Sequence, residues 1–417
     1  MDSLAEINLK GGYRMNFLEE SYEISETSEK GLFEMLTRVS NRTKFEVVDP
    51  VSITIYSLLQ EPVEGATGFD IVKIKPAYAD MRLFTPQKNG DAYFSTDKGN
   101  IGTMPFDAFV NNGLPKEMLE EIKTVGYFMQ VTTEKGMTVT LIPSKGFLAT
   151  WCRQCGVGKL EEGIDPMRDI YLASRLVYAE PFTLVYRTDG KFGKAFGCFS
   201  AKFGADPQMI IWDFKERLMK EYTNVTVRCW EYTHSITSVD FTLNDKTFKA
   251  GNMRVTPGVR FTLSDIGDAS YSFRLVLYCN GGCILLPATV SRKRSGKLDI
   301  ADMIKEFYES CVPEIEKIKK MFEKALSIKV KNTGDKIITL LRSVGFTTAI
   351  GKKGSEEYFS RYQENSAEGT MEDVLVTILR IPGIAKQKEC RSCLNKISDS
   401  IGNIFTAKEV TKLFKEG

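Results

Sequence analysis

Apolar and polar residues alternate in the middle of the chain, and this alternation predicts three consecutive β-strands. The first run extends from Val259 to Ser264, and the second extends from Tyr271 to Cys279. Because side chains on a strand point to opposite faces in turn, each run places its apolar residues on one face. Asn280-Gly281 tolerates the positive φ angles of a tight hairpin. A third run, Cys283 to Val290, is therefore expected to pair with the second.

The residues after this hairpin set further expectations. A three-residue loop would place Cys279 opposite Cys283. Pro287 would put the third strand at a sheet edge or in a bulge, because proline cannot donate to a ladder. Apolar residues then recur at helical spacing from residue 300 to residue 326, which predicts an amphipathic helix that covers a sheet or another helix. Pro313 either kinks this helix or begins a second one, since proline suits a first helical turn.

Strand-like and helix-like segments alternate up to about residue 330, and only helix-like segments follow. Ser28, Ser144 and Asp165 precede helix-like segments, where their side chains would cap the first turn. The pattern predicts an α+β protein with mixed, mainly antiparallel sheets covered by helices. Because 417 residues exceed the size of a single core, we expect several domains. They are an N-terminal α+β region at 1–143, a central α+β domain at 144–330 and a small all-helical C-terminal domain at 331–417.

Composition indicates a globular protein in a reducing compartment. The chain is 42% hydrophobic and 26% charged, and no apolar run approaches the ~20 residues of a membrane helix. No secretory signal is visible at the N-terminus, and nine scattered cysteines are typical of reduced thiols, so we expect a cytoplasmic protein with no membrane partner. Residues 1–286 hold 32 basic against 36 acidic side chains, whereas residues 287–417 hold 24 against 18. This mild asymmetry permits a nucleic-acid-binding face in the second part.

Motifs for catalysis and cofactors are absent from the sequence. Neither the Walker-type phosphate loop nor the Gly-x-Gly-x-x-Gly fingerprint occurs, and residues 351–355 lack the required spacing. The only histidine, His234, lies at a predicted turn, where ordinary hydrogen bonding is the simpler interpretation. We therefore assign no catalytic residue and no cofactor. An enzyme with a carboxylate or thiol site formed by residues distant in sequence remains the alternative.

Two Cys-x-x-Cys pairs are the candidates for a metal site. They are Cys152 with Cys155, and Cys390 with Cys393. Two such pairs can bind zinc through four thiolates. Each pair lies inside a predicted helix and far from the other, so buried thiols are the simpler interpretation, and a redox role is a further alternative.

Basic and aromatic residues occur together at the end of the predicted hairpin. The cluster comprises Arg292, Lys293, Arg294, Lys297, Tyr271 and Tyr278. Lysines 317, 319, 320 and 324 continue the positive charge along the predicted helix. Proteins that bind single strands combine such a cationic path with rings on which bases stack. The alternative interpretation is a solvated helix face with Glu–Lys pairs at i,i+4 spacing.

Five segments also support a family resemblance. They are Leu172–Leu176, Val185–Arg187 with Gly190, Ala195–Phe203, Ser264–Gly267 and Phe273–Gly282. In this order they resemble the uncharacterised phage/plasmid-like proteins, a domain family of unknown function found in bacteriophages and mobile elements. The sequence departs from that family at Ser200–Phe203, where a Ser-Asp-x-Tyr-like step is usual, and at Tyr278–Gly281, where a Cys-Thr/Ser-Asn-Gly-like step is usual. It also departs in the basic segment, which lacks a histidine. No site residues are known for the family, so none are transferred.

The resemblance implies a phage- or plasmid-encoded protein in the cytoplasm of a bacterial host. Together with the basic and aromatic cluster, it predicts a non-catalytic DNA-binding protein. Such a protein would bind single-stranded DNA during replication or recombination, for example by annealing strands as a homo-oligomer. The alternative is a phage structural or host-takeover protein that acts through contacts with a phage or host protein.

Overall fold

The computed structural model describes most of the chain between residues 23 and 381. The described residues are 23–59, 70–76, 84–86, 92–94, 101–105, 114, 116–133, 135–188, 192–201, 203, 207–267, 269–279, 282–292, 300–310, 313–343, 346–362 and 368–381. Five residues with predicted roles, Lys293, Arg294, Lys297, Cys390 and Cys393, lie outside them, as do residues 382–417 of the expected helical C-terminal domain. The predicted α+β class is confirmed, since helices cover sheets that are almost entirely antiparallel.

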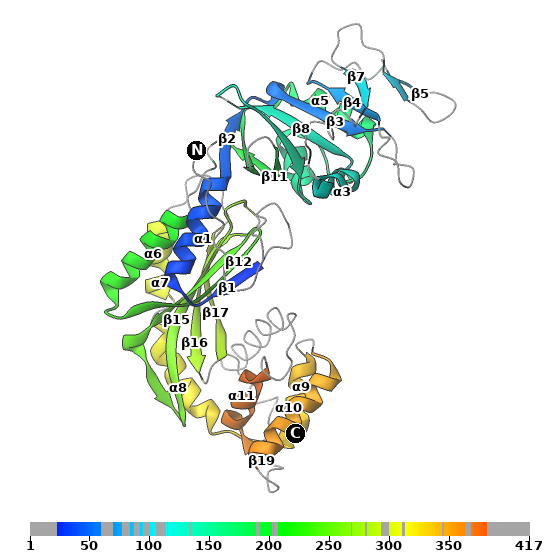
Figure 1. The fold of residues 1–417 in the computed structure, drawn as a ribbon. Helices are drawn as coiled ribbons and strands as arrows, with labels where there is room; N and C mark the ends of the chain where they lie inside the picture. The colour runs from blue at the N-terminus through cyan, green and yellow to red at the C-terminus, as the bar shows by residue number, and fades with distance from the viewer. Residues whose placement is uncertain are drawn as a thin grey trace.

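A seven-stranded antiparallel sheet forms the first layer (Figure 1). Its order is β1 (Glu23–Glu26), β12 (Val225–Thr233), β13 (Thr237–Leu243), β15 (Met253–Leu263), β16 (Tyr271–Cys279) and β17 (Gly282–Arg292), with β14 (Phe248–Ala250) beside β15. Alternate residues on these strands are buried in one core, where the ring of Phe214 stacks on Phe273 with centroids 4.5 Å apart. Burial of this face drives formation of the sheet.

Four helices cover that apolar face. They are α1 (Glu29–Arg42), α6 (Pro207–Glu221), α7 (Ile300–Ser310) and α8 (Glu314–Leu326). The Ser28 side chain accepts a hydrogen bond from the Gly31 amide at 3.1 Å, so its predicted role as a cap is confirmed. Pro313 is the N-cap of α8, and it therefore begins a second helix. Helices α1 and α6 lie side by side, and α7 contacts both α6 and β17.

An eight-stranded sheet forms a second unit. Its order is β2 (Thr43–Val48), β10 (Phe182–Thr188), β11 (Phe192–Ser200), β9 (Thr138–Pro143), β8 (Tyr127–Thr132), β3 (Ile53–Leu58), β4 (Asp70–Ile74) and β7 (Ile101–Pro105). Only β9 and β11 pair in parallel among the described strands. Helices α3 (Lys116–Val125), α4 (Phe147–Gln154) and α5 (Pro166–Leu176) pack on it, and β5 (Phe84–Pro86) pairs with β6 (Ala92–Phe94).

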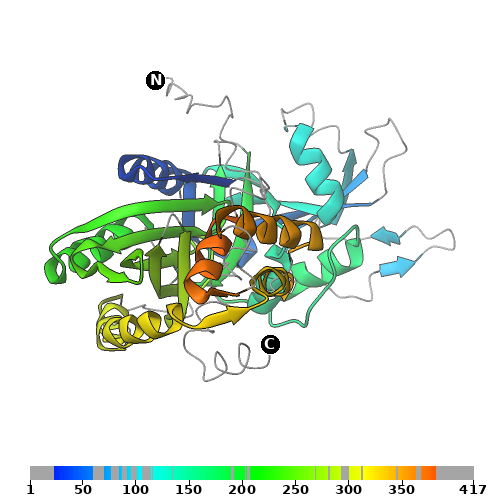
Figure 2. The same cartoon turned by 90° about the horizontal axis from the view of Figure 1, so that it is seen from below.

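The C-terminal part of the described chain is mainly helical. It comprises β18 (Lys329–Lys331), α9 (Thr333–Ser343), α10 (Thr348–Tyr362), β19 (Glu368–Thr370) and α11 (Met371–Leu379), which Figure 2 shows from below. The two short strands pair with each other, which the sequence pattern did not predict. Apolar residues of these helices belong to the same core as the seven-stranded sheet. The amide of Asn252 also donates to Glu372 at 2.8 Å.

Strand pairing divides the chain differently from the expected boundary near residue 143. Strands β8 and β9 precede that boundary, yet β9 pairs with β11 beyond it. Residues 23–42 belong with the seven-stranded sheet, and residues 43–200 belong with the eight-stranded one. The chain therefore enters the second unit directly from α1, because Thr43 both caps that helix and begins β2.

Two local expectations are wrong, and one at Pro287 is confirmed. Cys283 lies opposite Tyr278, and Cys279 lies opposite Gly282. The hairpin loop is therefore one residue shorter than the three-residue loop that would place Cys279 opposite Cys283. Ser144 does not cap α4, whose N-cap is Gly146 at φ 87°. Strand β17 ends the sheet order, and its register shifts opposite Arg274 and Val276, which accommodates Pro287 at an irregular edge.

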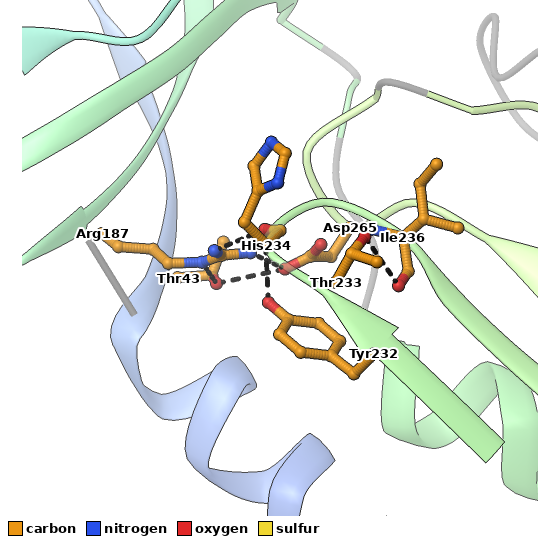
Figure 3. A network of polar contacts seen from close by, with 7 residues as sticks. All are labelled: Thr43, Arg187, Tyr232, Thr233, His234, Ile236 and Asp265. Carbon is orange, nitrogen blue, oxygen red and sulfur yellow. Dashed lines mark hydrogen bonds and ion pairs between the residues drawn. The ribbon is translucent and has the colours of Figure 1, made fainter. Parts of the chain in front are cut away.

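A buried ion pair joins the two units (Figure 3). Arg187 on β10 donates to Asp265, which follows β15, at 2.7 Å, and both side chains are 1% exposed. Arg187 also donates to the carbonyl of His234 at 2.7 Å and to the Thr43 hydroxyl at 3.1 Å, and its guanidinium lies 4.7 Å from the ring centroid of Phe196. One side chain therefore connects β2, β10, the β12–β13 turn and the loop after β15.

Candidate nucleic-acid interface

The face of the seven-stranded sheet that points away from α1, α6, α7 and α8 carries most of the sheet's polar residues, next to a small buried apolar cluster of Val276, Tyr278 and Leu285. Strand alternation puts the residues of the main core on the helix side, and their neighbours in sequence on the other side. In one row across four strands, Cys229, Asp240, Arg260 and Arg274 are successive partners in register. We call this side of the sheet the polar face.

Arg260 and Asp240 form the centre of the polar face. Arg260 donates through Nε to Oδ1 of Asp240 at 2.7 Å and through Nη2 to Oδ2 at 2.8 Å. Burial lowers the pKa of Arg260, but the hydrogen bonds and the charge of Asp240 outweigh burial and raise it well above its ordinary value. Arg274 donates to the carbonyl of Leu286 at 2.7 Å. These two arginines are held in place by the sheet itself.

Three further cations surround this centre. Arg228 lies at the register shift of β12, and Lys249 and Arg254 are partners on β14 and β15. All three are exposed. Among the side chains that the structure describes on this face, these three cations with Arg260 and Arg274 outnumber the carboxylates of Glu231 and Asp240. The described side chains of the polar face therefore carry net positive charge.

Hydroxyl groups fill the positions between the charges. They belong to Thr226, Ser238, Thr242, Thr256, Thr262, Ser272 and Ser291. Several pair across strands, such as Thr226 with Thr242 at 2.8 Å and Ser238 with Thr262 at 3.2 Å. Hydroxyls and cations on one surface are the groups that contact phosphate and sugar oxygens.

The predicted basic and aromatic cluster does not form one surface. Tyr271 packs in the main core on the helix side of the sheet, away from the polar face, so the prediction that it contacts nucleic acid is wrong. Tyr278 lies on the polar face but is 5% exposed. Arg292 is exposed at the sheet edge, where it forms an ion pair with Glu306 of α7. The lysines of α8 also lie on the helix side of the sheet.

The thiols in the described residues have the properties of structural cysteines. Cys152 and Cys155 are buried and form no disulfide, and burial raises the pKa of both, that of Cys155 to about 12. Burial and the nearby carboxylate of Asp240 likewise raise the pKa of Cys229 to about 12. No group of three metal-ligating side chains occurs in the described parts of the chain. Protonated, buried thiols are poor nucleophiles and poor metal ligands.

Two other polar features are less suited to a macromolecular ligand. Asp169 accepts from Arg168 and Ser57, but all three side chains are sealed inside the eight-stranded unit. Burial raises the pKa of Asp169 to about 6. An open groove of ≈ 430 Å³ lies between α6 and α7, where Arg217, Lys220 and Lys305 are offset by Glu221 and Glu309. Its mixed charge favours neither an anion nor a cation.

Sequence reasoning missed the polar face, although its signal was present. In β15, Arg254, Thr256, Arg260 and Thr262 recur with the period of two that marks one strand face. Alternation alone does not show that the polar residues of separate strands meet on one face, because strand order and register decide that.

Among the described residues, no helix combines the length and the apolar character needed to span a bilayer. The chain was compared with protein-family models, curated proteins and solved structures, and none of the three comparisons found a match.

Proposed function

We propose that the protein binds single-stranded nucleic acid on the polar face of the seven-stranded sheet, and that it acts by holding the strand and not by changing it. The observation that carries the proposal is the excess of cations among the described side chains of that face: Arg228, Lys249, Arg254, Arg260 and Arg274 against Glu231 and Asp240. Neutralising phosphate charges releases counterions, which supplies most of the affinity in sequence-independent binding.

The arrangement of the charges supports a strand lying across the sheet. Arg260 and Arg274 are fixed by hydrogen bonds to Asp240 and Leu286, whereas Arg228, Lys249 and Arg254 are exposed around them. Fixed arginines can order a backbone at little entropic cost, and exposed ones can follow it. The hydroxyls between them can donate to phosphate and sugar oxygens.

A role in replication or recombination of a phage or plasmid belongs to this proposal, because the sequence resemblance implies that context. Annealing of strands by a homo-oligomer is the specific activity that we put forward. A native mass measured with and without single-stranded DNA tests the oligomer separately from binding.

The direct test compares two variants that lose the same charge. In the first, Arg228, Lys249 and Arg254 are replaced by Gln on the polar face. In the second, which is the control, Lys30, Lys320 and Lys324 are replaced by Gln on the helix side, where all three are exposed. Fluorescence anisotropy with a labelled oligothymidylate should show a loss of about tenfold or more for the first variant only.

Equal losses in the two variants would show that net charge matters and that the polar face does not. Absence of binding by the natural protein at low salt would refute the proposed function.

Contacts with a partner protein are the second candidate function. Met209, Trp212 and Met219 are 63%, 43% and 53% exposed along the outer side of α6, and Met and Trp are enriched at interfaces. This candidate predicts that Trp212→Ala abolishes co-purification with one phage or host protein while leaving binding to DNA unchanged. Loss of DNA binding in Trp212→Ala would count against it.

A further inference from the structure

The ring of Tyr278 reaches across the polar face onto the neighbouring strand. A Cβ atom at Gly258 of β15 would lie 2.6 Å from Cε2 of Tyr278, closer than real Cβ contacts, so glycine is what leaves room for the ring. Gly258 is the partner of Thr242 on one side and of Val276 on the other. The ring therefore leans along the sheet and does not stand out from it.

The guanidinium of Arg228 covers this ring. Its Cζ lies 4.5 Å from the ring centroid, which is also the separation at which two aromatic rings stack. Arg228 comes from a bulged position on β12, two strands away from Gly258, and bulges re-aim side chains. It is exposed, and no carboxylate in the described residues forms an ion pair with it. Because Arg228 is exposed, a ligand can reach its guanidinium and displace it from the ring.

The hydroxyl of Tyr278 is buried, and within the part of the chain that the structure describes it has no hydrogen-bond partner. Burial raises the pKa of Tyr278 well above its ordinary value, with a further contribution from the charge of Asp240, so the group stays protonated and able to donate. A buried donor without a partner is unfavourable, and an acceptor brought by a ligand would remove that cost. The hydroxyl is thus a second feature of the same ring that suits an incoming polar, planar group.

We infer that Tyr278 is a stacking position for one base of the bound strand, and that the base takes the place now held by the guanidinium of Arg228. The displaced guanidinium then pairs with a neighbouring phosphate of the same strand. Rings on sheet surfaces stack bases in this way without regard to sequence, because every base has a π-face. This inference rests on the proposed function and specifies how the polar face distinguishes a nucleic acid from other polyanions.

The test separates base contacts from phosphate contacts. Two labelled probes of about 20 nucleotides, longer than the ~4–16 nucleotides of single-strand sites, are titrated: an oligothymidylate and an abasic strand with the same phosphates. Tyr278→Leu should weaken binding of the oligothymidylate by ~10-fold, the size of one lost stacking contact, and leave the abasic strand unchanged. Tyr278→Phe keeps the ring and should retain most of the affinity for both probes.

Equal weakening for both probes, or no weakening for either, would overturn the inference while leaving the proposed function in place. Failure of the natural protein to bind either probe would refute the proposed function and this inference with it. If Tyr278→Leu does not fold, a measurement on the natural protein tests the inference instead. Ultraviolet cross-linking of a bromouracil-substituted strand should label the peptide that contains Tyr278, and labelling confined to other peptides would contradict the stacking position.

Discussion

Replacing Arg187 by Met should weaken the junction between the two units of the protein. The substitution removes the donors to Asp265, to the carbonyl of His234 and to the Thr43 hydroxyl, and it leaves the carboxylate of Asp265 buried without its cation. Removing one partner of a buried ion pair costs ~3–5 kcal/mol. A stability of ~5–15 kcal/mol is typical of a whole domain, so this loss is large.

The assay is chemical denaturation followed by limited proteolysis at the junction. Arg187→Met should lower the free energy of unfolding by ~3–5 kcal/mol and expose cleavage sites near residue 43 or residue 203. The double variant Arg187→Met with Asp265→Asn removes both charges, and it should be ~1–3 kcal/mol more stable than the sum of the single losses predicts. A loss below ~1 kcal/mol in Arg187→Met would refute the reasoning, because it would place the pair in an environment as screened as a surface salt bridge.

Three further predictions concern burial. Burial raises the pKa of Asp169 to about 6, above its ordinary ~3.9, so the protonated side chain stabilises the fold below pH ~4 and this stabilisation is lost as the pH rises through 6. The natural protein should therefore lose ~3 kcal/mol of unfolding free energy between these pH values, measured from urea midpoints. Asp169→Asn should not show this pH-dependent loss, and an equal loss in the variant would contradict the assignment to Asp169. Gly258→Ala places a Cβ 2.4 Å from the carbonyl oxygen of Phe241, so thermal unfolding should reveal a loss of ~1–3 kcal/mol, and an unchanged melting temperature would contradict that geometry. Phe214→Ala removes a fully buried ring stacked on Phe273 and should cost ~3–5 kcal/mol by denaturant titration, whereas Trp212→Ala on the exposed side of α6 should cost far less.

Local patterns predicted the local structure well. Ser28 caps α1, Pro313 begins α8, and β17 is an irregular edge strand at Pro287, because each of these outcomes follows from the conformational limits of one residue. The strands β16 and β17 also lie where alternation predicted them. The error of register at Cys279 arose from a single residue of loop length, which alternation alone does not determine.

Long-range pairing was not predictable from the sequence. Strand β1 joins β12 across some two hundred residues, and β9 pairs in parallel with β11, so neither partner carries a local signal. The same limitation applied to the candidate site. Arg228 and Tyr278 meet over Gly258 only because β13 and β15 lie between their strands. The predicted cluster placed Tyr271 and Tyr278 on one surface, but strand alternation separates odd-spaced neighbours onto opposite faces.

The dependence of affinity on salt tests the central claim most directly. The logarithm of the binding constant for an oligothymidylate is measured against the logarithm of salt concentration, for the natural protein and for the variant with Gln at Arg228, Lys249 and Arg254. A strand held by the polar face predicts that the variant's slope is shallower by ~2, since each lost phosphate contact on a single strand removes ~0.7. Identical slopes for the two proteins would contradict the claim and place the binding surface elsewhere.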